Sequence, residues 1–191
     1  LTDKIVIDIG ASTGGFTDCS LQNGAQKVYA IDVGYNQLAW KLRSDDRVVV
    51  MEKTNARYLE ADDIDEQGDI GVVDVAFISL TKIIPALQKL LKDKAELITL
   101  IKPQFEAGPD KVGNKGVVKD PAIHKEVINK ILDFAVKEGL TPKKLSYSPI
   151  TGGKGHNIEY LAHFKSDSDN NSQEFKESID QVIKEAHNSL Q

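Results

Sequence analysis

Nearly continuous apolar runs alternate with amphipathic segments over the first two thirds of the chain. Runs rich in Val, Ile and Leu occupy residues 4–9, 27–33, 48–53, 70–78 and 97–102. Such runs predict strands that are covered on both faces, because a strand with one wet face would alternate apolar and polar residues. Helices are predicted between these strands, at residues 16–23, 36–43 and 80–92. This order of strands and helices indicates an α/β fold with a mostly parallel sheet and right-handed crossovers.

The pattern changes after Pro103. Residues 104–119 are rich in Gly and Lys, and they form a segment longer than most loops, which favours a functional or mobile loop. Asp120 followed by Pro121 is typical of a helix N-cap and first helical residue. The remaining predicted elements are that helix, to about residue 138, two late strands at 145–150 and 158–164, an acidic linker at 166–172 and a final helix at 174–187.

These elements add up to a seven-stranded sheet with helices on both faces. We expect residues 1–165 to form one domain, to which residues 166–191 add the acidic linker and a C-terminal helix. The chain starts at Leu1 and not at Met, so we also expect it to be a piece of a longer protein.

Composition and length are those of a globular protein. The chain has 191 residues, of which 40% are hydrophobic and 28% are charged, and it has a single cysteine, Cys19. One cysteine cannot form an internal disulfide bond, so a reducing, cytoplasmic setting is expected. The sequence has no window of about 18 apolar residues, which argues against a membrane-spanning helix.

The net charge of −5 argues against binding to nucleic acid, but the distribution of charge argues for it. Residues 1–101 carry a charge of −5, residues 102–165 carry +4, and residues 166–191 carry −4. A polyanion responds to the local sign of the charge more than to the total. The middle-to-late segment is therefore a candidate for contact with a polyanion, although solvated lysines on helix faces would give the same count.

The most informative segment runs from Asp8 to Phe16 and reads DIGASTGGF. It lies between a predicted strand and a predicted helix, which is where open α/β sheets bind ligands. Ser12 stands where a dinucleotide-binding motif has its second glycine, and the Gly-Lys-Ser/Thr of a phosphate loop does not follow. The carboxylate of Asp8 disfavours a phosphate and suits a cationic ligand such as S-adenosylmethionine. The expected cofactor-binding residues in this segment are Asp8, Gly10, Ala11, Ser12, Thr13, Gly14, Gly15 and Phe16.

Other strand ends complete the expected cofactor site. Asp32 follows the second strand, and a carboxylate can accept hydrogen bonds from both hydroxyls of a ribose. Val33 follows Asp32 at the same edge, and Asn55, after the third strand, is expected to bond an adenine ring. Asp74 lies within the predicted fourth strand, where an acid among apolar residues is costly unless it is used or paired. A tight turn with incidental acids is the alternative interpretation.

Candidate catalytic groups lie at the same edge. Lys102 ends the fifth strand, and a lysine beside the low-dielectric core can serve as a base. Glu159 lies at the start of a late strand. If Asp74, Lys102 and Glu159 meet at the carboxyl edge of the sheet, the lysine can take the proton of an alcohol while the acids orient and tune it. For Asp74, a salt-bridged acid of the core is the alternative.

Seven blocks of the sequence, in order, resemble the TlyA family of rRNA methyltransferases, which are also labelled hemolysin A. The blocks are residues 8–18 (DIGASTGGFTD), 30–42 (AIDVGYNQLAWKL), 54–57 (TNAR), 77–80 (FISL), 102–106 (KPQFE), 116–120 (GVVKD) and 157–160 (NIEY). This resemblance implies an FtsJ-like domain with the Rossmann-like class I methyltransferase fold. It also implies S-adenosylmethionine as the methyl donor and a ribose 2′-hydroxyl of ribosomal RNA as the acceptor.

The resemblance also assigns roles to the candidate catalytic residues. The family carries a Lys-Asp-Lys-Glu tetrad, and Asp74, Lys102 and Glu159 match its last three members, with Lys102 as the general base. The family's first lysine lies in a block before the first strand, and this sequence lacks that block; Lys4 is too close to the strand to replace it. The family's small upstream RNA-binding domain is also missing from the sequence. We therefore expect the chain to be inactive by itself.

The basic segment gains a candidate role as an RNA contact. Its lysines in Gly-rich loops are Lys111, Lys115, Lys119 and Lys154. Contacts from such lysines to phosphates would position RNA without reading its sequence. A solvated side chain is the alternative for each single lysine.

Other features of the sequence argue against further functions. The aromatic residues Phe16, Tyr35, Trp40 and Phe105 are expected in the core or at the cofactor's edge, and not as base-stacking platforms. The four histidines lack the spacing of a metal site, so no metal is expected. Two alternative functions stay open: an RNA- or ribosome-binding module without catalysis, and a membrane-lytic hemolysin. The acidic final helix disfavours the second, because it would be repelled by anionic lipid.

Overall fold

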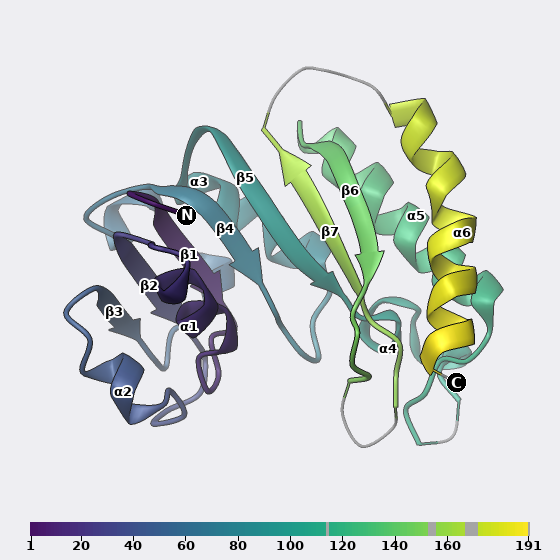
Figure 1. Ribbon diagram of the computed structural model, residues 1–191, viewed down its shortest axis with the longest axis horizontal. Helices are drawn as coiled ribbons and strands as arrows, with labels where there is room; N and C mark the ends of the chain where they lie inside the picture. The colour runs from purple at the N-terminus through teal and green to yellow at the C-terminus, as the bar shows by residue number, and fades with distance from the viewer. Residues whose placement is uncertain (114, 153–155, 167–171, 191) are drawn as a thin grey trace. The chain divides into compact units, whose positions relative to one another are not determined.

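The computed structural model describes residues 1–113, 115–152, 156–166 and 172–190, without the side chains of residues 172–177. The strands are β1 (Ile5–Ile9), β2 (Lys27–Ile31), β3 (Val48–Met51), β4 (Gly68–Val73), β5 (Leu91–Ile101), β6 (Thr141–Tyr147) and β7 (Tyr160–Lys165). They form one sheet in the order β3-β2-β1-β4-β5-β7-β6 (Figure 1). The predicted α/β fold with a mostly parallel, seven-stranded sheet is therefore confirmed.

Helices and short turns connect these strands. The helices are α1 (Gly15–Gln22), α2 (Trp40–Arg43), α3 (Ile84–Lys89), α4 (Pro103–Glu106), α5 (Pro121–Lys137) and α6 (Ser172–Leu190). Single 3-10 turns lie at Ala56–Tyr58, Ala61–Asp63, Leu80–Lys82 and Pro109–Lys111.

The chain divides into two compact units. The first comprises residues 1–75 and 82–98, and the second comprises residues 76–81 and 99–191. The short segment 76–81 belongs to the second unit, although the chain on either side of it belongs to the first. The predicted cofactor residues all lie in the first unit, whereas Lys102, Glu159 and the lysines of the basic segment lie in the second.

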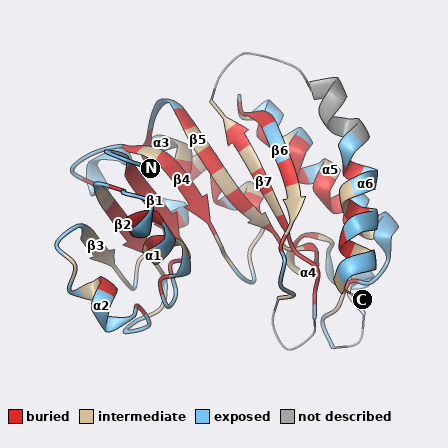
Figure 2. Ribbon diagram, viewed as in Figure 1, coloured by how far each residue is buried: buried red, intermediate tan, exposed pale blue. Residues whose placement is uncertain are grey.

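In the first unit, β1 is the central strand. It pairs in parallel with β2 and with β4, and β2 pairs in parallel with β3. All residues of β1 are buried, as expected for a strand that is covered on both faces (Figure 2). The registers bring Ile9 opposite both Ile31 and Val73. The residues that follow these strand ends therefore start from one edge of the sheet: Gly10, Asp32 and Asp74.

Helix α1 packs against β1 and β2 through its apolar face. Leu21 of this helix is buried in a cluster with Val6 and Val28, and Phe16 packs against that cluster. The helix begins directly after Gly14, so the predicted cofactor loop and the start of α1 form one continuous strand–turn–helix segment.

In the second unit, β6 and β7 pair antiparallel, and α5 and α6 pack against β6 and against each other. The predicted start of α5 is confirmed. The carboxylate of Asp120 accepts a hydrogen bond from the N–H of Ala122 at 2.8 Å, and Pro121 is the first helical residue. Among the described side chains of α6, Ile179, Ile183 and Ala186 are apolar and buried.

The predicted helix over residues 80–92 is shorter in the structure. Helix α3 ends at Lys89, and β5 begins at Leu91, well before the predicted start at residue 97. The N–H of Gly68 donates to the carbonyl oxygen of Leu90 at 2.8 Å, so pairing with the start of β4 replaces the next helical turn. Leu90 and Leu91 suit a helix and a strand equally, and the apolar pattern could not separate the two.

The predicted end of the fourth strand is also wrong. Strand β4 stops at Val73, so Asp74 follows the strand and does not lie within it. The N–H of Asp74 donates to the carbonyl oxygen of Ile9 at 3.0 Å, which is the last contact along β1. Phe77 then has a φ of 63°, outside the extended region, so the strand cannot continue through it.

Other predicted boundaries also differ. Helix α2 begins at Trp40 and not at residue 36, because Asn36 has a φ of 56°, which a right-handed helix does not contain. The predicted loop at residues 104–119 includes most of α4 and one 3-10 turn. Strand β6 runs from Thr141 to Tyr147, earlier than the predicted residues 145–150.

Candidate active site

The turn after β1 is built around Gly10. Its φ of 82° lies in the left-handed region, which glycine adopts without strain. A Cβ atom at this position would lie 2.1 Å from the backbone oxygen of Asp74, so only glycine fits. The N–H groups of Gly10 and Ala11 both donate to the carbonyl oxygen of Ile31, at 2.8 and 3.2 Å. The turn is thereby fixed against the ends of β2 and β4.

Asp32 is held in place by two backbone groups. Its Oδ2 accepts the N–H of Ser12 at 2.8 Å, and its Oδ1 accepts the N–H of Gly34 at 2.7 Å. A carboxylate offers about four acceptor positions, so each oxygen keeps capacity for a further donor. Asp32 is half-buried. Its carboxylate is therefore oriented before a ligand arrives, which favours the predicted contact with a ribose.

Asp8 lies beneath the loop and not on its surface. The residue is fully buried, and its Oδ2 accepts the hydroxyl of Thr17 at 2.6 Å. Burial raises the pKa of the Asp8 carboxyl to about 7; the hydrogen bond from Thr17 opposes this shift, and the charges of Asp74 and Asp32 add to it. Asp8 is therefore tied to α1 through Thr17, and its part in cofactor binding stays a prediction.

These residues fit a cationic nucleoside better than a phosphate. Among the described residues, Oδ1 of Asp8 is buried and has no hydrogen-bond partner. The charges of Asp74 and Asp32 both raise the pKa of Asp8, so these two carboxyl groups lie within electrostatic reach of the third. An anion would be repelled here, whereas a positive charge would stabilise the ionised carboxylates. The residues present therefore fit a ligand that combines a positive charge with a ribose.

The other predicted cofactor residues differ in exposure. Exposed are Ser12, Thr13, Gly15, Val33 and Asn55, whereas Ala11 and Gly14 are buried and Phe16 is half-buried. Gly14 lies against the side chains of Leu38 and Leu42, where a Cβ would approach to 2.1 Å. The side-chain oxygen of Asn55 accepts the N–H of Arg57 at 3.2 Å, so its amide N–H groups are the donors that it could offer to an adenine ring.

The predicted catalytic residues are divided between the units, with Asp74 in the first and both Lys102 and Glu159 in the second. Lys102 is half-buried and is the N-cap residue of α4, directly after β5. Glu159 is buried, and its Oε1 accepts the side-chain N–H of Gln104 at 2.9 Å. Because Gln104 lies in α4, this bond ties Glu159 to the segment that begins at Lys102. The meeting of Asp74 with the other two stays a prediction.

A glycine makes room for the carboxylate of Glu159. A Cβ atom at Gly152 would lie 2.0 Å from Oε1 of Glu159. Gly152 and Asn157 exchange two backbone hydrogen bonds, at 2.8 and 3.2 Å, which hold Gly152 beside the segment that carries Glu159. Sequence reasoning did not single out Gly152, and its place in a Gly-rich turn was the available signal.

Two of the aromatic residues expected in the core or at the cofactor's edge lie on the surface. Tyr35 is 67% exposed and Trp40 is 78% exposed, so a place in the core is wrong for both, and a place at the cofactor's edge stays a prediction. The segment between β2 and α2 turns through Asn36 and leaves the sheet before the helix starts, which carries both rings outward. The ammonium of Lys53 lies 4.2 Å from the centre of the Tyr35 ring, a cation–π contact. Phe16, in contrast, packs on the core as expected.

Phe77 is a candidate functional residue that sequence reasoning missed. Its side chain is 91% exposed, and its φ of 63° lies in a region that non-glycine residues rarely adopt. Its ring centre lies 4.9 Å from that of Phe105, at an angle of 52°. Strained backbone and an exposed ring together are typical of a functional position. The available signal was the FISL block, three residues after Asp74.

The Gly- and Lys-rich loop before α5 is anchored to the residues just before β7, which include Glu159. The N–H of Val118 donates to the side-chain oxygen of Asn157 at 3.1 Å, and the side-chain N–H of Asn157 donates to the carbonyl of Gly116 at 2.9 Å. The carbonyl of Val118 lies 2.9 Å from Nε2 of His124. A carbonyl only accepts, so Nε2 carries the proton and Nδ1 accepts the hydroxyl of Tyr160, at 2.7 Å.

The predicted RNA-contacting lysines differ in whether an acid pairs with them. Lys111, Lys115 and Lys119 are exposed. Lys111 forms an ion pair with Glu126, whose charge offsets its own. Lys154 lies outside the described residues. Lys115 and Lys119 therefore carry the prediction of a phosphate contact within the described part of the chain.

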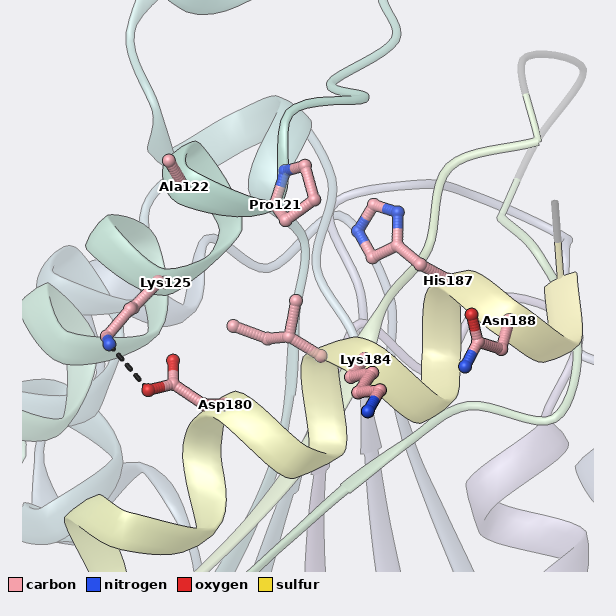
Figure 3. Close-up of a pocket in the computed structure, with 8 residues that line it drawn as sticks. Pro121, Ala122, Lys125, Asp180, Lys184, His187 and Asn188 are labelled. Atoms are coloured by element: carbon pink, nitrogen blue, oxygen red, sulfur yellow. Dashed lines mark hydrogen bonds and ion pairs between the residues drawn. The ribbon is translucent and has the colours of Figure 1, made fainter.

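A cavity of about 430 Å³ lies between α5 and α6 (Figure 3). Its apolar lining comes from Pro121, Ala122 and Ile183. Lys125 and Asp180 form an ion pair at one side, with 2.7 Å between Nζ and Oδ2. None of the predicted site residues lines this cavity. No metal-binding cluster of His, Cys, Asp or Glu and no helix able to cross a membrane occurs in the described residues.

Comparison with known proteins identifies the relatives of the chain. Residues 2–166 match the family described as FtsJ-like methyltransferase. The chain is 52% identical to the Bacillus subtilis protein YqxC, whose name places it among rRNA methyltransferases, over 98% of this chain and 68% of that protein. It is 48% identical to hemolysin A of Brachyspira hyodysenteriae, over 85% of this chain and 68% of that protein. It is 44% identical to the 16S/23S rRNA (cytidine-2′-O)-methyltransferase TlyA of Mycobacterium tuberculosis, over 85% and 60%.

Solved structures also resemble the chain. A structure from Streptococcus thermophilus, titled as a hemolysin, superposes with a TM-score of 0.93 at 50% identity, over 98% of this chain and 68% of that one. A structure from Listeria monocytogenes, titled as an S-adenosylmethionine-dependent methyltransferase, gives a TM-score of 0.63 at 15% identity, over 87% and 92%. The second likeness concerns the fold alone. The resemblance to the TlyA family is confirmed by these relatives.

Proposed function

The chain belongs to the FtsJ-like methyltransferase family, and from this premise we propose that it transfers a methyl group from S-adenosylmethionine to a ribose 2′-hydroxyl of ribosomal RNA. The observation that carries the proposal is the shared edge of β1, β2 and β4, from which Gly10, Asp32 and Asp74 start. This is where an open α/β sheet binds a nucleoside ligand.

The cofactor residues have complementary tasks in this proposal. Asp32, fixed by the N–H groups of Ser12 and Gly34, accepts the ribose hydroxyls. The exposed loop from Ser12 to Gly15 offers backbone groups beside the ligand, and Asn55 donates to the adenine ring. Asp8 supplies negative charge beneath the loop, which favours the cationic end of the ligand. S-adenosylmethionine supplies an electrophilic methyl group bound to a sulfonium.

Lys102 acts as the general base on the acceptor. Its amine would take the proton of the 2′-hydroxyl, so that the oxygen could accept the methyl group that bound S-adenosylmethionine would supply. Glu159 and Asp74 orient the lysine and the hydroxyl. Beyond proton transfer, the reaction needs alignment of oxygen, carbon and sulfur, which rigid strand ends provide.

The RNA partner is supported by charge and by the relatives' names. Residues 102–165 carry a charge of +4, and Lys115 and Lys119 are exposed in this segment. Relatives from Mycobacterium tuberculosis and Campylobacter jejuni are named rRNA (cytidine-2′-O)-methyltransferases, which favours a cytidine of rRNA as the acceptor. The exposed ring of Phe77, supported by Phe105, is available to stack on that base.

Transfer of labelled methyl groups to ribosomal subunits tests the proposal. The chain is assayed alone and joined to the segment that YqxC carries beyond the matched region. We expect transfer from the joined protein, and loss of at least about 100-fold in Lys102→Ala, the range of general base catalysis. Lys137→Ala, an exposed lysine at the end of α5, serves as the control and stays at the wild-type rate.

The outcomes separate the candidate functions. Cofactor binding by calorimetry without transfer by either protein would favour an RNA-binding module without catalysis. Undiminished transfer by Lys102→Ala would remove Lys102 from the mechanism. The chain by itself is expected to bind S-adenosylmethionine, because all the predicted cofactor residues lie within its first unit.

A further inference from the structure

Glu106 is a buried carboxylate that the proposed chemistry does not use. It is the last residue of α4 and stands four positions after Lys102, and its side chain is 2% exposed. A buried carboxylate is costly unless its oxygens are bonded. Here both are: Oε1 accepts the N–H of Leu80 at 2.7 Å, and Oε2 accepts the hydroxyl of Ser79 at 2.6 Å.

A third donor joins Glu106 to α5. The ammonium of Lys130 donates to the backbone oxygen of Glu106 at 2.8 Å and lies 3.4 Å from its Oε2. The side chain of Lys130 is 48% exposed, so solvent screens its interaction with Glu106, which contributes little. The two bonds to Ser79 and Leu80 are sheltered, and they dominate.

These bonds fix an unusual piece of chain. Residues 76–81 belong to the second unit, although the chain before and after them belongs to the first. The segment begins two residues after Asp74, and it includes Phe77 in the left-handed region. Such a conformation is strained in a residue other than glycine and persists only where the surroundings hold it. Glu106 accepts hydrogen bonds from Ser79 and Leu80, two and three residues after Phe77.

We propose that Glu106 is a positioning residue for methyl transfer. It fastens the segment of residues 76–81 to α4, so that Phe77 stays against Phe105 and the segment that follows Asp74 keeps a fixed relation to the helix that Lys102 caps. This inference rests on the proposed function. Glu106 touches neither substrate nor cofactor in this scheme; it acts through Phe77 and through α4.

Substitutions of Glu106 and Ser79 leave different numbers of the hydrogen bonds of the Glu106 carboxylate in place. Glu106→Ala removes both sheltered bonds, whereas Ser79→Ala removes one of them together with the two bonds between the Ser79 hydroxyl and Thr81. Glu106→Gln keeps an oxygen for Leu80 and places an N–H₂ group toward Ser79 Oγ, which can accept it. We expect the single-turnover rate of methyl transfer at saturating RNA to fall at least tenfold in Glu106→Ala and about threefold to tenfold in Ser79→Ala, and to recover to within about threefold of wild type in Glu106→Gln. The affinity for S-adenosylmethionine stays within about twofold, because its predicted residues lie in the first unit.

A loss of stability alone must be distinguished from a loss of position. Ile128→Val, in the buried core of α5, lowers stability by leaving a small cavity, and it removes none of the hydrogen bonds of Glu106. Its rate well below the melting temperature should equal that of wild type. Lys130→Met removes the exposed donor and should also keep the rate within about twofold.

The results decide between three cases. A rate for Glu106→Ala and Ser79→Ala equal to that of Ile128→Val overturns the positioning role. If Glu106→Ala does not fold, Ser79→Ala decides by the same criterion. If wild type transfers no methyl group to rRNA in the joined protein, the proposed function fails first. Faster amide exchange of Leu80 in Glu106→Ala, which lacks the oxygen that Leu80 bonds, than in Ile128→Val would then report only a structural clamp.

Discussion

The carboxylate of Asp32 accepts the backbone N–H of Ser12 at 2.8 Å, although the two residues are 20 positions apart. The bond joins the end of β2 to the loop after β1. It orients the carboxylate, and it also holds Ser12, whose φ of 48° is unusual for a residue other than glycine. The same side chain therefore shapes the loop and is expected to bind the ribose.

Replacement of Asp32 should weaken cofactor binding. A hydrogen bond to a charged group contributes about 1.5–3 kcal/mol, so Asp32→Ala should raise the dissociation constant of S-adenosylmethionine about 10- to 100-fold in calorimetry. Asp46→Ala, an exposed acid of the same unit, should leave the constant unchanged. An Asp32→Ala protein with wild-type affinity would move the ribose site to another residue.

The raised pKa of Asp8 makes stability depend on pH. The folded-state pKa of about 7 exceeds the ordinary value of 3.8, so the folded protein holds a proton that the unfolded chain releases between these values. Stability contributed by this group therefore falls as the pH rises from about 4 to about 7. In urea unfolding, the stability of Asp8→Asn relative to wild type should be about 2–3 kcal/mol more favourable at pH 8 than at pH 5. An equal difference at both pH values would mean that Asp8 has an ordinary pKa.

The affinity for S-adenosylmethionine should also depend on the ionisation of Asp8. It should rise with pH, whereas the contribution of Asp8 to stability falls. A cationic ligand favours ionised Asp8, so affinity for S-adenosylmethionine should rise as the pH increases through about 7, with release of a proton on binding. Calorimetry in buffers of different ionisation enthalpy measures this release. Asp8→Asn should bind with little change across this range; a pH dependence that persists in the variant would assign the titration to another group.

Two glycines of the loop should respond in opposite directions to alanine. Gly10→Ala places a Cβ atom 2.1 Å from the backbone oxygen of Asp74 at a φ of 82°, and should lower the free energy of unfolding by more than about 2 kcal/mol. Gly15, the first residue of α1, has no atom within 4 Å of its Cβ position. Gly15→Ala should raise stability by about 0.5–1 kcal/mol. Thermal unfolding of both variants checks the geometry of the turn, and a stable Gly10→Ala protein would contradict it.

Two substitutions of Phe77 should separate the effect of its backbone conformation on stability from the effect of its ring on RNA binding. Phe77→Gly and Phe77→Ala both remove the ring contact with Phe105, but glycine alone relieves the left-handed backbone. The glycine variant should therefore be more stable than the alanine variant by about 1 kcal/mol. If the ring stacks on a base, both variants should bind RNA about 5- to 100-fold more weakly. Equal RNA affinity in wild type and both variants would leave the exposed ring without this role.

The sequence predicted the order of the elements well and their ends less well. Strand β1 and the cap of α5 depend on local features, an apolar run and an Asp-Pro pair, and both are confirmed. The junction of α3 with β5 depends on a bond between Gly68 and Leu90, which are 22 positions apart, and no local pattern encodes it. The exposure of Trp40 likewise depends on the direction in which the chain leaves the sheet.

The candidate site divides in the same way. The sequence by itself determined which chemical groups are present at the strand ends, because glycines and acids at the ends of apolar runs are local features. Only the tertiary structure decided how these groups behave: Asp8 is enclosed and titrates near 7, Asp32 is held by Ser12, and Glu106 is shared between Ser79 and Leu80. Burial and hydrogen bonding depend on neighbours that are distant along the chain, and they alone set the desolvation and the orientation of a charged group.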